Sequence, residues 1–481
     1  MKTRHTIILV MSVLVSACAA DGSVDEPVAE LEWQPCSMSE AECAVIEVPF
    51  DHDRPELRSF ELPIARHPAR RADQRIGILV VNPGGPGGGG VWMAQDAEFY
   101  FSDEILDRFD IVGFDPRGNG GARPELDCTD DVDAYFGLDP SPDDPVERTA
   151  LVDGARNFVD GCVANSGKIL PYVSTEATAR DIDLIRRVLG EETASYFGFS
   201  YGSELGATWV TLFPATVRAA VFDAAADPTL DLIDWLALQS SGFENSLEEF
   251  LDRCDATGCQ MSTPGETARQ TFDRIMSGLD ESPLVVDVDR PAVGQGTALV
   301  GVFSALYDPT AWDDLDRAIA DVDDGFGDRL VTWYDDYFGG YRDGHSDDAI
   351  DAYVAISCLD RTRSFGVDEA FAAVDDILAQ SPRLGSTVLQ ELLLCAQWPV
   401  EPKPAPDVHW TGERPILVVG GTGDPATPLP GTRRMFETLG NARLVVVDSF
   451  EHTSYGSNEC ATAAVDRYLV DLVVHDGELA C

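Results

Sequence analysis

The chain has 481 residues, of which 44% are hydrophobic, so it can bury a large core and has room for more than one domain. Its 34 Lys and Arg residues against 84 Asp and Glu residues give a formal net charge of −50. Such a surface repels nucleic acid and anionic membranes, which excludes charge-driven binding to either. Two explanations of the acidity stay open: adaptation to high salt, and a GC-rich genome.

The N-terminus has the pattern of an export signal. Lys2 and Arg4 precede an apolar core of about ten residues at 6–15, which is too short to span a bilayer. Small residues then lead into Cys18, which resembles the end of a bacterial lipoprotein signal. We expect a signal at 1–17, acylation of Cys18 as the sole membrane attachment, and an acidic tether at 18–35. The protein is then held on the outer face of the cell membrane, or is secreted if the signal is an ordinary one and Cys18 is incidental.

A glycine-rich loop follows the first strongly apolar run. Residues 76–81 predict a buried strand that runs into Asn-Pro-Gly-Gly-Pro at 82–86 and four further glycines. Backbone N–H groups can reach a tetrahedral oxyanion only where no side chain intervenes, so this loop suits an oxyanion hole. The predicted donors are the N–H groups of Gly85 and Tyr201. The alternatives are a flexible linker and a P-loop, and the P-loop is excluded because no Gly-Lys-Ser/Thr closes the run.

The most informative stretch is Gly-Phe-Ser-Tyr-Gly at 198–202. It lies between an apolar strand-like run at 194–199 and a helix-like run from residue 204, which is the context of a nucleophile elbow. Ser200 is then the nucleophile, and its acid and base should follow in the order Asp or Glu, then His. The alternative is a structural Gly-rich turn without chemistry.

Four histidines follow Ser200, and His452 directly succeeds an apolar strand-like run at 442–447. Asp424 likewise follows the apolar run at 415–419, and the gap to His452 leaves room for one helix and one strand. Asp448 is the rival acid, but it lies only four residues before His452. We therefore predict a Ser200, Asp424, His452 triad.

Strand-like and helix-like runs alternate through the chain, which predicts an α/β fold. The long gap between the predicted strands at 217–222 and 415–419 holds amphipathic runs, at 235–251, 268–279, 312–322 and 369–378. The predicted organisation is a core at 36–230 and 396–481 with a mainly helical lid at 231–395.

The chain has eleven cysteines, and removing Cys18 leaves ten, which suggests five disulfides in an exported protein. Sequence does not fix their connectivity; pairing of neighbours gives Cys36–Cys43, Cys128–Cys162, Cys254–Cys259, Cys358–Cys395 and Cys460–Cys481. A metal site at Cys254 and Cys259 is the alternative for that pair, although no His or second Cys pair is near.

Taken together, these motifs resemble one enzyme family. The matching segments are 82–87, Asp-Pro-Arg-Gly at 115–118, 198–202, 424–428 and the Glu-His pair at 451–452. The sequence is similar to the serine peptidase branch of the α/β-hydrolases that contains the proline iminopeptidases, and more closely to the actinobacterial tripeptidyl aminopeptidase-like group. Three positions depart from the pattern: Asn119, Glu204 and Glu451.

The resemblance implies an α/β-hydrolase fold, a mostly parallel central sheet flanked by helices with an inserted lid. It implies an aminopeptidase that releases short peptides through an acyl-enzyme on Ser200, with no metal and no organic cofactor. Its partners would be peptides, and a monomer is favoured. The substrate ammonium needs a carboxylate, for which the candidates are Glu204, Glu244, Glu248 and Asp360, each with the alternative of a solvated surface acid. A carboxylesterase or lipase with the same triad, and a non-catalytic binding protein, are the competing functions.

Overall fold

The computed structural model describes residues 31–37, 39–286, 290–338, 349–360 and 363–481. The predicted signal, Cys18 and most of the predicted tether lie outside these residues. In the described part, no helix is both long and apolar enough to cross a membrane.

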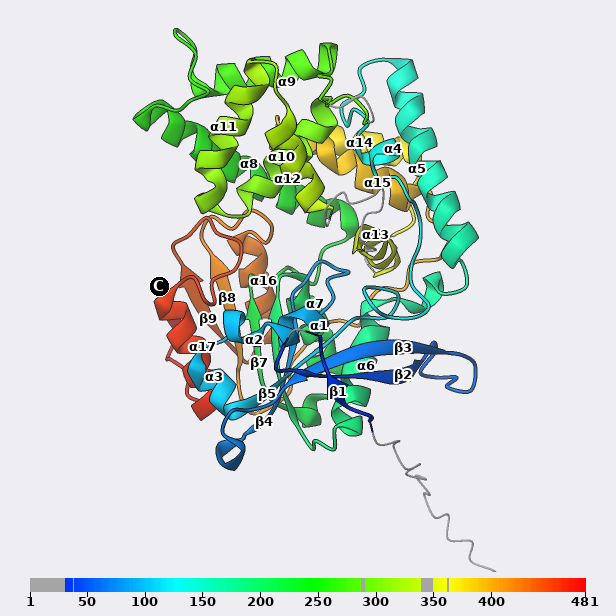
Figure 1. Ribbon diagram of the computed structural model, residues 1–481, viewed down its shortest axis with the longest axis vertical. Helices are drawn as coiled ribbons and strands as arrows, with labels where there is room; N and C mark the ends of the chain where they lie inside the picture. The colour runs from blue at the N-terminus through cyan, green and yellow to red at the C-terminus, as the bar shows by residue number, and fades with distance from the viewer. Residues whose placement is uncertain (1–30, 38, 287–289, 339–348, 361–362) are drawn as a thin grey trace, which may run out of the picture.

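A ten-stranded sheet forms the lower half of the molecule in Figure 1, in the order β1-β2-β3-β5-β4-β6-β7-β8-β9-β10. Strands β1 to β3 are antiparallel to one another, β3 is antiparallel to β5, and every other neighbouring pair is parallel. The strands are β1 Gln34–Pro35, β2 Glu42–Pro49, β3 Ser59–His67, β4 Gly77–Asn82, β5 Phe109–Phe114, β6 Ala194–Phe199, β7 Val217–Asp223, β8 Ile416–Gly421, β9 Ala442–Val447 and β10 Glu478–Ala480. The central parallel strands are buried on both faces, as their continuous apolar runs predict.

Helices cover both faces of the sheet. One apolar cluster includes side chains of α6 and α7, and the other includes side chains of α1, α3 and α17. The helices around the sheet are α1 Val91–Gln95, α2 Ala97–Tyr100, α3 Asp103–Arg108, α6 Thr175–Val188, α7 Tyr201–Leu212, α16 Leu429–Leu439 and α17 Glu459–Asp471. This is the α/β-hydrolase architecture that the resemblance implies.

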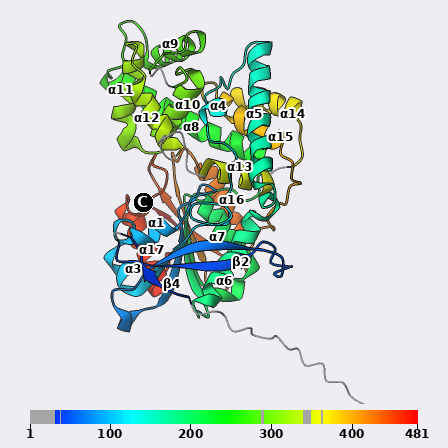
Figure 2. The ribbon, with the colours of Figure 1, turned by 45° about the vertical axis from the view of Figure 1, so that its right-hand side comes forward.

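The upper half in Figures 1 and 2 is helical, and its segment lies between β7 and β8 in the chain. Its helices are α8 Leu232–Thr257, α9 Ala268–Glu281, α10 Gln295–Leu306, α11 Trp312–Asp323, α12 Asp328–Tyr337, α13 Ala349–Asp360, α14 Val367–Leu378 and α15 Val388–Ala396. We call these eight helices, with the described segments that connect them, the lid. They have an apolar cluster of their own, centred on α8 to α12.

Two helices from the predicted core segment lie beside the lid instead of on the sheet. They are α4 (Asp133–Phe136) and α5 (Pro145–Ser166), and both views show α5 alongside the lid helices. The Tyr135 hydroxyl donates to the Gln390 carbonyl at 2.6 Å, and the Gln390 side chain donates back to the Tyr135 carbonyl at 3.1 Å. The 36–230 segment thus contributes to both halves of the molecule.

All ten predicted cysteines are paired in the structure, and each pairs with its neighbour. Because Cys254 and Cys259 share a disulfide, their thiolates are not free to hold a metal. Cys358–Cys395 joins the lid helices α13 and α15.

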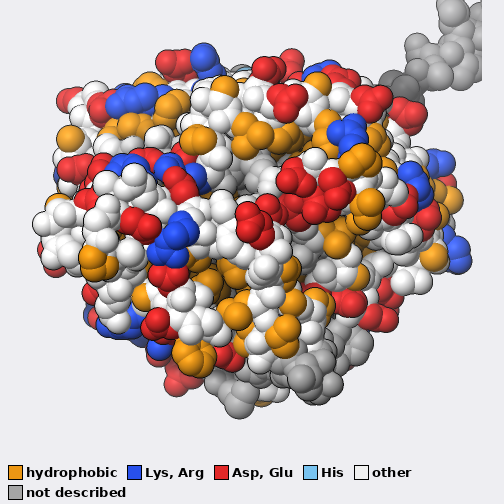
Figure 3. Space-filling view, turned by 90° about the horizontal axis from the view of Figure 1, so that it is seen from above, with side chains coloured by type: hydrophobic (Ala, Val, Ile, Leu, Met, Phe, Trp, Pro, Cys, Tyr) orange, Lys and Arg blue, Asp and Glu red, His pale blue; other side chains and the backbone are white. Residues whose placement is uncertain are grey.

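Acidic side chains are numerous at the lid end of the molecule, which Figure 3 views from above, and arginines lie among them. Several of the acids are paired: Arg383, for example, contacts Glu248 at 2.6 Å and Asp273 at 2.7 Å. Part of the net charge is therefore offset locally.

Candidate active site

Ser200 occupies the tight turn between β6 and α7. Its backbone is strained, with φ 54° and ψ −125°, as a nucleophile elbow requires. A Cβ on Gly198 would lie 2.3 Å from the Gly202 carbonyl oxygen, and one on Gly202 would lie 2.8 Å from the Asn82 side chain. Only glycine therefore fits at positions 198 and 202, two residues before and after the serine.

The structure brings Asp424 and His452 together. His452 Nδ1 lies 2.9 Å and 3.0 Å from the two Asp424 carboxylate oxygens. Asp424 also accepts the N–H groups of Ala426 and Thr427 at 3.0 and 2.9 Å, and the Thr427 hydroxyl at 2.9 Å. The rival acid, Asp448, is exposed and accepts the Thr422 hydroxyl. This geometry selects Asp424 as the partner of the histidine.

The Asp424 contact sets the chemistry of His452. Burial lowers the pKa of His452, but the charge of Asp424 and the hydrogen bond to it outweigh this, so the net pKa is raised. The bond also holds the proton on Nδ1, which leaves Nε2 as the general base. The ring packs against Tyr307 with centroids 5.4 Å apart, and the His452 N–H donates to the Tyr307 carbonyl at 2.9 Å. A lid residue thus helps to fix the histidine.

The glycine-rich loop after β4 lies against the nucleophile. Gly84 and Gly85 have φ of 106° and 115°, which favours glycine. A Cβ on Gly84 would lie 2.8 Å from the Phe199 carbonyl oxygen and 3.0 Å from Ser200 Cβ. Gly85 and Tyr201 both line the space at Ser200, so their N–H groups stay the predicted oxyanion donors.

Asp115 braces this loop, as its position after β5 suggests. Its carboxylate accepts the Val91 N–H at 3.2 Å and the Gly121 N–H at 2.9 Å. A Cβ on Gly89 would lie 2.5 Å from the carboxylate. The aspartate therefore joins the glycine-rich loop to the loop that follows β5.

Asp223, at the end of β7, is a functional residue that the sequence reasoning missed. It is fully buried, and its carboxylate accepts the Tyr455 N–H at 2.7 Å and the Ser454 N–H at 3.1 Å. Its own carbonyl accepts the Ser200 N–H at 2.9 Å. Burial raises the pKa of Asp223 to about 6 despite these bonds. The residue connects the serine turn with the loop that carries His452. The sequence feature that could have identified it is an acid at the end of an apolar strand.

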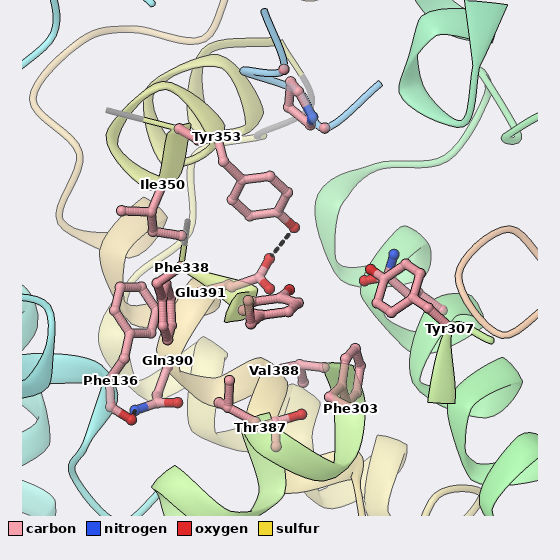
Figure 4. A pocket seen from close by; sticks show the side chains of 17 residues that line it. Phe136, Phe303, Tyr307, Phe338, Ile350, Tyr353, Thr387, Val388, Gln390 and Glu391 are labelled. Atoms are coloured by element: carbon pink, nitrogen blue, oxygen red, sulfur yellow. Dashed lines mark hydrogen bonds between the residues drawn. The ribbon is translucent and has the colours of Figure 1, made fainter. Parts of the chain in front are cut away.

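The space above Ser200 is walled by both halves of the molecule. Core residues Gly85, Pro86 and Tyr201 line one side, and lid residues that include Tyr307, Tyr337 and Tyr353 line the other. A second cavity of about 270 Å³ shares these tyrosines and reaches Glu391 of α15, as Figure 4 shows. Sequence reasoning missed Glu391, because it is a single acid in an otherwise mostly apolar helix.

The acids predicted to bind the substrate amine are in different places. Glu204 lies in the first turn of α7 and lines the space at Ser200. Glu244 accepts the N–H groups of Arg383 and Leu384 at 3.1 and 3.0 Å, and Glu248 pairs with Arg383. Both therefore stabilise the lid instead of facing the nucleophile, which corrects that expectation.

Asp360 accepts the Thr175 N–H at 2.8 Å and lines a third cavity, of about 780 Å³, which shares Tyr201 and Glu204 with the space at Ser200. Among the described residues, the groups with metal-ligand spacing are Cys254, Cys259 and Asp316; Glu40, His67 and Glu98; and Asp143, Asp144 and Glu147. None of these lines the space at Ser200.

Two family models match the chain: the TAP-like protein model at residues 381–481 and the alpha/beta hydrolase fold model at residues 77–273. Serine protease Hip1 of Mycobacterium tuberculosis is 31% identical, over 94% of this chain and 90% of the relative. Carboxylesterase B of the same species is 34% identical, over 92% and 86%. Tripeptidyl aminopeptidase of Streptomyces coelicolor is 29% identical, over 94% and 83%. The chain therefore belongs to the α/β-hydrolase superfamily, in its TAP-like group of serine peptidases.

Proposed function

We propose that the protein is an exported aminopeptidase that releases short peptides, of tripeptidyl type, from free N-termini. The observation that carries this proposal is the position of Ser200 between core and lid, next to a cavity of about 270 Å³. That volume is near the lower end of the range for small-molecule sites, roughly 300–1,000 Å³, so it suits a short acyl group. The resemblance to tripeptidyl aminopeptidase supports the same substrate class.

The mechanism follows from the triad. His452 Nε2 takes the proton of Ser200 Oγ as the oxygen attacks the scissile carbonyl, and Asp424 stabilises the imidazolium that forms. The N–H groups of Gly85 and Tyr201 would bind the oxyanion. His452 then protonates the leaving amine. Water attacks the acyl group on Ser200 while His452 takes its proton, and His452 returns that proton to Ser200 Oγ as the peptide is released.

A carboxylesterase is the second candidate. Its supporting observations are the apolar walls of the cavity, which include Val300, Phe303 and Phe338, and the similarity to carboxylesterase B. An apolar wall suits a fatty acyl chain as well as a peptide side chain.

Three substrates separate the two functions: a tripeptide p-nitroanilide with a free amino terminus, its N-acetylated form, and p-nitrophenyl butyrate. Ser200→Ala is the control and should abolish every activity. Cleavage of the free tripeptide anilide but not its acetylated form supports the aminopeptidase. Cleavage of the ester without cleavage of either anilide would contradict the aminopeptidase and favour the carboxylesterase.

Export through a lipid on Cys18 is part of the proposal. Cells that express the protein should incorporate an alkynyl fatty acid into it, and Cys18→Ser should remove the label. A secreted, unlabelled wild-type protein would show that the signal is an ordinary one.

A further inference from the structure

The cavity that holds Glu391 adjoins the space at Ser200. Both spaces are lined by the residues Gly85, Pro86, Gln239, Tyr307, Tyr337 and Tyr353. A group bound in the cavity can therefore belong to the same molecule as the acyl group on Ser200. What the cavity binds decides which end of a peptide reaches the serine.

Glu391 provides the charge in this cavity. Figure 4 shows its carboxylate directed toward the Tyr353 hydroxyl, which donates to Glu391 Oε2 at 2.7 Å. Among the described lining residues there is no Lys, Arg or His to neutralise it. Burial raises the pKa of Glu391 to about 7, because the tyrosine hydroxyl compensates only part of the lost hydration. The carboxylate would gain from a cationic ligand.

Aromatic rings surround this carboxylate. Tyr307, Tyr337 and Tyr353 line the same cavity, and Figure 4 shows Phe303 and Phe338 around it as well. Ring faces attract an ammonium, and tyrosine oxygens can accept its N–H groups. One carboxylate among aromatic rings repels anions and offers too few hard oxygens for Ca²⁺ or Mg²⁺.

We propose that Glu391, with Tyr353 and the neighbouring tyrosines, binds the protonated N-terminus of the peptide substrate. The assignment rests on the proposed aminopeptidase function. It replaces the lid acids Glu244 and Glu248, whose carboxylates are occupied by Arg383 and by backbone N–H groups. The distance between this anchor and Ser200 would then determine how many residues the enzyme removes.

The test compares wild type, Glu391→Gln and Glu249→Gln on the three substrates named above. Glu249 is an exposed lid residue, so its variant makes the same chemical change without touching the cavity. Glu391→Gln should raise KM for the free tripeptide anilide at least about 30-fold, which corresponds to losing one partner of a buried charge pair. Because butyrate carries no amine, the ratio of kcat/KM for the free tripeptide anilide to kcat/KM for the ester should fall in this variant, and Glu249→Gln should match wild type on all three.

Retained preference for the free amine in Glu391→Gln would overturn the assignment, as would loss of that preference in Asp360→Asn alone. A wild-type enzyme that cleaves only the ester would instead refute the proposed aminopeptidase function. Failure of the Glu391 assignment and failure of the proposed function are therefore distinguishable.

If Glu391→Gln fails to fold, binding of the free and acetylated tripeptides to Ser200→Ala is measured by calorimetry between pH 5.5 and 8.5. The anchor requires that affinity for the free peptide falls below about pH 7, relative to the acetylated one. Parallel pH profiles for the two peptides would overturn it.

Discussion

Replacement of Asp223 by Asn tests whether this residue holds the catalytic histidine in place. The Tyr455 and Ser454 N–H groups both bond Oδ2, so the amide oxygen can keep these two bonds, but a buried NH₂ group then replaces the Oδ1 that also accepts the Ser454 N–H, at 3.2 Å. An unsatisfied buried donor costs roughly 1–3 kcal/mol. The change also removes a buried charge whose pKa is raised from 3.8 to about 6, which is worth roughly 3 kcal/mol above pH 6. These two effects oppose each other, so we expect little change in melting temperature at pH 8.

Catalysis should respond more strongly than stability. Ser454 and Tyr455 lie two and three residues after His452 in the same loop, and a displacement of the order of 1 Å at a catalytic group costs about a hundredfold in rate. We therefore expect kcat to fall roughly 10- to 100-fold in Asp223→Asn. The charge of Asp223 also raises the pKa of His452, so its loss should lower that pKa. Since His452 acts as a base only when unprotonated, the acid limb of kcat/KM should move to lower pH.

The assay is kcat/KM for p-nitrophenyl butyrate from pH 5 to 9, together with thermal unfolding at pH 8. Asp466→Asn is the matched control, because this buried acid accepts the Tyr455 hydroxyl at 2.8 Å and does not act on the histidine charge. It should leave the acid limb unmoved. A limb that stays in place or moves to higher pH in Asp223→Asn, with kcat within twofold of wild type, would refute the reasoning.

Three further changes test other parts of the site. Gly84→Ala should lower kcat by about a hundredfold or more in a steady-state assay, because the added methyl meets the Phe199 carbonyl at 2.8 Å and displaces the oxyanion loop. Replacing Cys358 and Cys395 by Ser, which opens a loop with a sequence separation of 37, should cost roughly 4 kcal/mol in chemical denaturation and raise KM for the tripeptide. Glu391→Gln should be more stable than wild type at pH 8 but not at pH 4. A carboxyl whose pKa is 4.5 unfolded and about 7 folded loses stability as pH rises between these values, roughly 3 kcal/mol in all. Equal melting curves at both pH values would contradict this.

The sequence predicted the parts of the site in which a catalytic residue comes soon after an apolar strand. Ser200, Asp424 and His452 each lie just beyond such a run, and the carboxyl ends of parallel strands meet at one edge of a sheet. The two partners of the triad that were found by position, Asp424 and His452, are within 2.9 Å of each other in the structure. The order of the apolar runs along the chain and the glycines of the tight turn were enough to predict the triad.

The lid was predicted as a helical segment, but half of its helices were not. Helices α10, α13 and α15 are apolar on most of their faces, because they lie between other helices. Amphipathic periodicity identifies a helix that has one face in water, so it does not reveal these three. Their side chains, Phe303, Tyr353 and Glu391 among them, line the cavity that adjoins the space at Ser200.

The position of α5 beside the lid was also not predictable from the pattern of apolar residues. No helix was predicted at 145–166, and a helix read from sequence shows only that one of its faces is covered, not which element covers it. In the structure α15 covers it through the apolar cluster that spans both halves, and the neighbouring helix α4 bonds to α15 through Tyr135 and Gln390. A long-range contact of this kind depends on the complete arrangement of the lid.

The acids of the site show why composition alone does not identify function in a chain with 84 Asp and Glu residues. Asp424 and Asp223 accept backbone N–H groups, which fix their positions and keep them directed at the catalytic loops. Glu244 is occupied in the same way inside the lid. Glu391 accepts only a tyrosine hydroxyl among the described residues and borders a cavity. A carboxylate satisfied by its own backbone holds a structure together, whereas one that lacks donors is left to bind a cation, and here that cation can be the substrate itself.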